Sequence, residues 1–147
     1  MALEIVHRKQ DGIEILDLRG RLTLGEENLI LRNGIKAAVS AGHIRLVLNL
    51  GKVTDIDTTG LGTLLFALTE LRKAGGGLAL ANLRLGHMRL LVVAKMGTVF
   101  EIFHRVHDAI DSFFPDRYLR RYDILEFVKS RGSETSRRDH AEHRGKG

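Results

Sequence analysis

Apolar and polar positions along the chain change their period several times, and each change predicts an element. Residues 44–50 are apolar at nearly every position, which is typical of a strand buried on both faces. Residues 51–54 predict a polar turn, and the sequence DIDTTG follows at 55–60. Leucines then recur at helical spacing up to about Lys73: Leu61, Leu64, Leu65, Leu68 and Leu71. A buried strand that leads through a short loop into a helix is a common place for α/β proteins to keep their chemistry.

The N-terminal part of the chain predicts a β-hairpin. Two runs with alternating apolar positions, 3–8 and 13–18, flank the sequence Gln-Asp-Gly at 10–12. Asp-Gly between alternating runs is a strong signal for a tight hairpin turn. Residues 20–23 are then expected to form a bend or a short strand.

A helix is predicted to follow this hairpin. Thr23 or Gly25 can cap it, and the acidic residues Glu26 and Glu27 are favoured near its positive end. Gly42 is expected to stop it.

Strands and helices continue to alternate in the second half of the chain. We expect a strand at 78–83, a short helix at 87–95, an extended run at 99–103 and a helix at 108–114. This alternation predicts an α/β fold in which helices cover a sheet.

The chain divides into three segments. Pro115 is the only proline and marks the expected end of a domain at 1–114. Residues 115–130 contain too many apolar side chains for a linker, so they predict an added helix that packs on its own domain or forms a dimer contact with a second copy. Residues 131–147 are polar and are expected to be a disordered tail.

The composition narrows the class of function. The net charge is +5, but much of the excess lies in or beside the C-terminal tail, and the chain has no Trp that could stack on bases. It has no Cys for disulfides, thiolate catalysis or cysteine-bound metal. No apolar run approaches the roughly 20 residues of a membrane span, and the N-terminus lacks the apolar region of a signal peptide. We therefore expect a cytoplasmic protein that binds neither nucleic acid nor membrane.

The order of these motifs resembles a known family. Residues 57–62 read Asp-Thr-Thr-Gly-Leu-Gly, which matches Asp-Ser-Ser/Thr-Gly-Leu-Gly in the STAS domain of bacterial anti-sigma factor antagonists. The glycines at 75–77 match a Gly-Gly that precedes the next strand in that family. The resemblance covers about residues 3–114 and implies a mixed sheet flanked by about four to five helices.

The resemblance also implies a function. Members bind an anti-sigma factor that is itself a serine/threonine kinase, and binding frees the sigma factor. The kinase phosphorylates the hydroxyl residue after the Asp, the modified antagonist lets go, and a phosphatase resets it. Carried over by position, the acceptor is Thr58, and Thr23 stands where the family often has an acid. The implied partner-binding residues are Asp57, Thr58, Thr59, Gly60, Gly62 and Thr23. No catalytic residue, metal or cofactor is implied.

Several of these residues have simpler interpretations. Asp57 is also a plain helix N-cap, and Thr59 is more typical of a buried or capping hydroxyl than of an acceptor. Gly60 and Gly62 permit either the approach of a partner or close packing of the helix on the sheet. Asp55 and Asp57 form a pair of carboxylates, but no His, Cys or Lys adjoins them in the sequence to complete an acid/base site.

Two further alternatives stay open. His104 and His107 have the spacing of metal ligands, but without a third ligand nearby in the sequence they are expected to be surface histidines. The whole chain can also be a STAS module that is not phosphorylated and that acts as a scaffold or ligand-binding part of a stress-signalling complex or a transporter.

Overall fold

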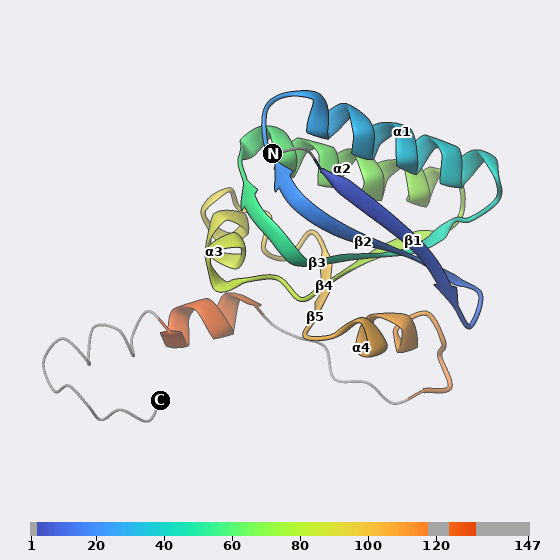
Figure 1. The fold of residues 1–147 in the computed structure, drawn as a ribbon. Coiled ribbons are helices and arrows are strands. Elements are labelled where there is room, and N and C mark those ends of the chain that lie inside the picture. The colour runs from blue at the N-terminus through green and yellow to red at the C-terminus, as the bar shows by residue number, and fades with distance from the viewer. Residues whose placement is uncertain (1–2, 118–123, 132–147) are drawn as a thin grey trace, which may run out of the picture.

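A computed structural model describes residues 3–117 and 124–131, and a five-stranded sheet forms its centre (Figure 1). The strand order is β1-β2-β3-β4-β5; β1 and β2 are antiparallel, and the other neighbours are parallel. The elements in chain order are β1 (Glu4–Gln10), β2 (Ile13–Leu22), α1 (Glu26–Ser40), β3 (Arg45–Ile56), α2 (Thr58–Lys73), β4 (Gly77–Ala81), α3 (Leu85–Val93), β5 (Glu101–Phe103) and α4 (Val106–Asp111). A further helical segment lies at 124–131. The predicted α/β class, with a mixed sheet and about four to five helices, is confirmed.

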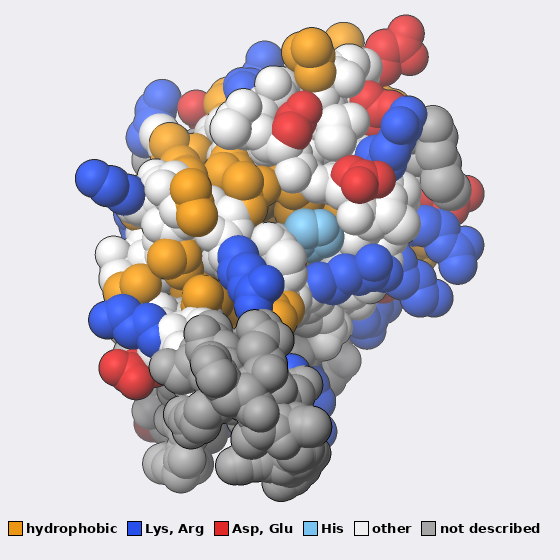
Figure 2. Space-filling view, turned by 90° about the vertical axis from the view of Figure 1, so that its left-hand side faces the viewer, with side chains coloured by type: hydrophobic (Ala, Val, Ile, Leu, Met, Phe, Trp, Pro, Cys, Tyr) orange, Lys and Arg blue, Asp and Glu red, His pale blue; other side chains and the backbone are white. Residues whose placement is uncertain are grey.

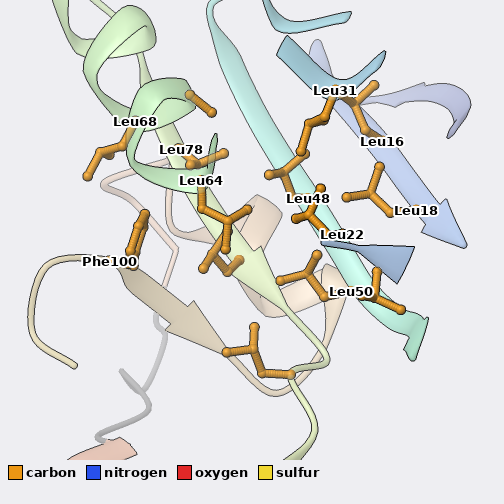
Figure 3. Packing of buried hydrophobic residues seen from close by; sticks show 14 of the residues in the cluster. Leu16, Leu18, Leu22, Leu31, Leu48, Leu50, Leu64, Leu68, Leu78 and Phe100 are labelled. Atoms are coloured by element: carbon orange, nitrogen blue, oxygen red, sulfur yellow. The ribbon is translucent and has the colours of Figure 1, made fainter. Parts of the chain in front are cut away.

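Side chains along each strand alternate between the two faces of this sheet. Both faces carry apolar side chains, and helices cover both of them. α1 and α2 lie side by side on one face, and α4 lies on the other (Figure 1). On the first face the leucines of β2, β3 and β4 pack against both helices, as Figure 3 shows for Leu31 of α1 beside Leu16 and for Leu64 of α2. The smaller core under α4 includes Ile15 and Val47.

The predicted hairpin is confirmed. Gln10 pairs with Ile13 across the turn, and both turn residues have positive φ, 55° at Asp11 and 81° at Gly12. Positive φ at both positions matches the right-handed twist of two-residue hairpins, and Asp-Gly adopts it at low cost.

The polar turn predicted at 51–54 is wrong. β3 continues to Ile56, and β2 extends in parallel with it to Leu22, so that Val53 is buried beside Gly20. Two irregularities in register accompany the extension. Pairing with a long neighbouring strand overrides the weak local preference for a turn, and bulges absorb the mismatch.

The segment after Pro115 contributes to the core where it is described. Ile124 is buried in the larger cluster, and Phe127 and Val128 pack against that cluster. The rest of the expected extension, 118–123, and nearly all of the expected tail, 132–147, lie outside the described residues. No helix within 3–117 or 124–131 combines the length and the apolar content that a membrane crossing needs.

Candidate functional site

The carboxyl ends of β2, β3 and β4 lie at one edge of the sheet, where each strand leads into a loop and a helix (Figure 1). This edge is the usual place for sites in α/β folds. The loop before α1 contains Thr23, and the junction before α2 contains Asp57 and Thr58. The fold therefore brings the two separate parts of the predicted site to the same end of the molecule.

Thr58 is the first residue of α2, and its side chain is exposed. Asp57 precedes it in an extended conformation, and its Oδ1 accepts a hydrogen bond of 2.9 Å from the backbone N–H of Gly60. Asp57 is therefore the N-cap of α2, as the simpler interpretation of the sequence held. Because the cap is made by Asp57, the hydroxyl of Thr58 is not needed for capping.

Asp57 also connects two segments. Its Oδ2 accepts a second hydrogen bond of 2.9 Å, from the backbone N–H of Leu24 in the loop before α1. Partial burial raises the pKa of the Asp57 carboxyl, but the hydrogen bonds from the N–H groups of Gly60, Leu24 and Thr59 outweigh it and hold the pKa below its usual value. The carboxylate is thus charged and bound at both oxygens at neutral pH.

The two glycines of the motif have different surroundings. A Cβ on Gly60 would collide with the backbone carbonyl of Leu22 and would lie 3.1 Å from Ile56 Cγ2. Close packing of α2 on the end of β2 therefore explains Gly60. A Cβ on Gly62 would meet no atom of the described residues within 4 Å, so no packing contact in that part of the chain explains this glycine.

Thr59 and Thr23 are half-buried and take part through their backbones. The carbonyl oxygen of Thr59 lies 3.3 Å from the hydroxyl of Thr63, and that of Thr23 accepts a hydrogen bond from the side-chain amide of Asn28. Through these backbone carbonyls, Thr59 and Thr23 help to hold the first turn of α2 and the loop before α1.

Sequence reasoning missed Asn28 and Thr63. Asn28 Oδ1 accepts a hydrogen bond of 2.6 Å from the hydroxyl of Thr63, and both residues are buried. The signal was present, since Asn28 lies at the helical spacing of the apolar residues Leu31 and Ile35, but only the three-dimensional structure reveals its partner on α2.

Two exposed apolar side chains lie in the segments that form the site. Leu24 is 77% exposed, and Leu65 is exposed two turns after Thr58 on the same face of α2 as Gly62. Figure 2 views this end of the molecule and shows apolar side chains in several separate groups with Lys and Arg between them. Apolar and basic side chains therefore share this face of the molecule.

Comparison with known proteins agrees with this architecture. The sequence model of the STAS domain matches residues 4–109. The chain belongs to the STAS domain family. No curated protein matches the sequence.

Solved structures support the STAS fold. An anti-sigma factor antagonist from Mycobacterium paratuberculosis is 19% identical with a TM-score of 0.67, and the match covers 76% of this chain and 93% of that one. The unphosphorylated form of the anti-sigma factor antagonist SpoIIAA is 22% identical with a TM-score of 0.60, over 78% of this chain and 99% of that one. The murine anion transporter Slc26a9 is 19% identical with a TM-score of 0.53, over 74% of this chain but only 21% of the transporter.

This STAS domain also places a histidine under the end of β3. His87 of α3 is buried and interacts with the backbone of Thr54, and its Nδ1 has no hydrogen-bond partner within the described residues. Burial lowers the pKa of His87, and the contact with Thr54 only partly offsets the effect. The charge of Arg84 also lowers the pKa of His87, whereas the nearby carboxylate of Asp55 raises it.

The other candidate groups do not converge. His107 Nε2 lies 3.2 Å from Asp111 Oδ2 within α4. Across 3–117 and 124–131, no group of three His, Asp or Glu side chains is arranged to hold a metal.

Proposed function

We propose that this STAS domain is an anti-sigma factor antagonist whose binding is controlled by phosphorylation of Thr58. It sequesters an anti-sigma factor that is also a serine/threonine kinase, and it thereby frees a sigma factor. The observation that carries the proposal is the exposed hydroxyl of Thr58 at the N-terminus of α2, where Asp57 already caps the helix. The hydroxyl is therefore available to a partner and to a kinase.

Gly62 supports a docking role for the surface beside Thr58. A glycine inside a helix costs about 1 kcal/mol relative to Ala, and packing does not require Gly62. Gly62 lies one helical turn after Thr58, so its missing side chain keeps the surface next to the hydroxyl flat. A closely fitting partner is a reason to retain it.

A phosphate on Thr58 would act as a local switch. It would add about −1.5 to −2 charges at pH 7 beside Asp57 and the exposed Asp55. The N–H groups and the positive end of the α2 dipole would tolerate this anion within the fold. A partner surface that fits a small hydroxyl would instead meet bulk, negative charge and a desolvation cost, so binding would be lost without a change of fold.

The proposal defines the partners. The protein binds the anti-sigma kinase and is reset by a phosphatase, and it needs no metal, cofactor or catalytic residue of its own. Because the kinase uses ATP, the proposal assigns the switch to the cytoplasm. A homodimer is not needed for it.

The test uses the cognate anti-sigma kinase, ATP and mass spectrometry. We expect a phosphate on Thr58 and none in the Thr58→Ala variant, which should still bind the kinase but resist release. Thr58→Asp should abolish binding, while Thr69→Asp, at an exposed position later in α2, should not. Tight binding by Thr58→Asp, or phosphate on another residue, would contradict the proposal.

A second candidate is a STAS module that is not phosphorylated. The likeness of this fold to part of an anion transporter and the Thr at the usual Ser position favour it. A neighbouring gene for a kinase-like ATPase would favour the switch, and neighbouring genes for transporter subunits would favour the second candidate.

A further inference from the structure

The loop between β2 and α1, residues 23–25, makes polar contacts with its neighbours among the residues that the structure describes. Gly25 is the N-cap of α1 and provides no side-chain cap. Leu24 is largely exposed, so its side chain does not anchor the loop in the core. The position of the loop therefore depends on polar contacts with neighbouring elements.

Two polar connections join this loop to α2. The first is the hydrogen bond from the N–H of Leu24 to Asp57. The second is a chain through Asn28, which donates its side-chain amide to the carbonyl of Thr23 and accepts the hydroxyl of Thr63 at 2.6 Å. Asn28 thus bridges the loop and the second turn of α2.

The contact between Asn28 and Thr63 is a buried polar pair, with 6% and 0% of the two residues exposed. α1 and α2 also meet elsewhere, since the Arg32 guanidinium lies 4.5 Å from the centre of the Phe66 ring. Apolar side chains of the same shape would fill the space between the helices as well, and a satisfied buried pair adds little net stability. Unlike an apolar pair, Asn28 and Thr63 also give the loop a defined position through their hydrogen bonds.

We propose that Asn28 and Thr63 are positioning residues for partner binding. They hold the loop 23–25 beside Thr58, so that a partner contacts the loop and the first turn of α2 as one surface. This rests on the proposed function and deepens it. The anti-sigma kinase must then offer an apolar socket for Leu24 next to its contact with the Thr58 hydroxyl.

Hydrogen–deuterium exchange of the full chain alone tests the positioning role. In Asn28→Leu, we expect the amide of Leu24 to exchange about tenfold faster, while the amide of Leu48 in the middle of β3 is unchanged. Asn33→Leu, at an exposed position of the same helix, is the matched control and should change neither amide. An unchanged Leu24 amide, or equal acceleration at both amides, would overturn the proposal. Thr63→Val, which is nearly isosteric, is the second variant if Asn28→Leu does not fold.

Titration calorimetry with the purified anti-sigma kinase tests the composite surface. Asn28→Leu and Leu24→Ala should each weaken binding about tenfold, and the double variant should bind no more weakly than Leu24→Ala alone. Losses that multiply would show that Asn28 acts independently of the loop and would overturn the proposal.

The two experiments separate this inference from the proposed function. If the wild-type chain binds no anti-sigma kinase, the proposed function fails. The exchange of the Leu24 amide then still decides the positioning role, which an accelerated amide supports and an unchanged one refutes.

Discussion

Gly60 and Gly62 are two positions apart in α2, and we predict opposite effects on stability when each is replaced by Ala. Both have backbone conformations that Ala can adopt within α2. A Cβ on Gly60 meets the carbonyl of Leu22, whereas a Cβ on Gly62 enters open space. Replacing Gly60 therefore tests the packing of α2 on β2, and replacing Gly62 tests the role of the surface beside Thr58.

The magnitudes follow from these surroundings. Ala in place of a helical Gly stabilises by about 0.5–1 kcal/mol, and at Gly62 nothing opposes this gain. At Gly60 the Cβ would clash with the Leu22 carbonyl, which is backbone and cannot rotate away. This clash should cost about 3 kcal/mol, the upper end for overpacking, so the free energy of unfolding should fall by about 2 kcal/mol in total. For a domain of this size, 1 kcal/mol corresponds to about 4 °C in melting temperature.

Urea unfolding followed by circular dichroism measures both free energies of unfolding. We expect Gly60→Ala to be less stable than the wild type and Gly62→Ala to be more stable but weaker in binding the anti-sigma kinase. A Gly60→Ala variant as stable as the wild type would refute the packing argument. A Gly62→Ala variant that binds normally would remove the functional reason for that glycine.

Three further predictions concern stability. Below pH 6.5 the unfolded chain protonates His87, whereas the folded state keeps it neutral to a lower pH, so the free energy of unfolding should fall as the pH drops below 6.5. In urea unfolding, His87→Gln should reduce this loss of stability, and an unchanged pH dependence would contradict the prediction. Asp57→Ala should lower the free energy of unfolding by about 1 kcal/mol at pH 7. This difference should vanish as the pH falls below 3.8 through the lowered pKa of Asp57, because the protonated carboxyl no longer caps the helix. An equal difference at pH 2.5 would count against this cause. Ile124→Ala should cost about 2–4 kcal/mol by thermal unfolding and the exposed Lys129→Ala close to nothing, and equal effects would show that residues 124–131 do not belong to the core.

Much of the fold follows from local patterns in the sequence. Asp11-Gly12 specifies the hairpin because both residues accept positive φ at low cost. Helical spacing of leucines predicts α2, and Asp57 before a helix predicts the cap that the structure contains. These features depend on residues within a few positions of one another, so sequence reasoning reaches them.

Contacts between distant segments were decided only by the tertiary structure. β3 extends to Ile56 because β2 pairs with it, although residues 51–54 locally favour a turn. The sequence equally allowed packing or partner contact at Gly60 and Gly62, and only the position of Leu22 distinguishes them. Asn28 and Thr63 are 35 positions apart, and their hydrogen bond exists because α1 and α2 pack on the same face of the sheet. Local preference is encoded in neighbouring residues, whereas the surroundings of a side chain depend on the whole chain once it has folded.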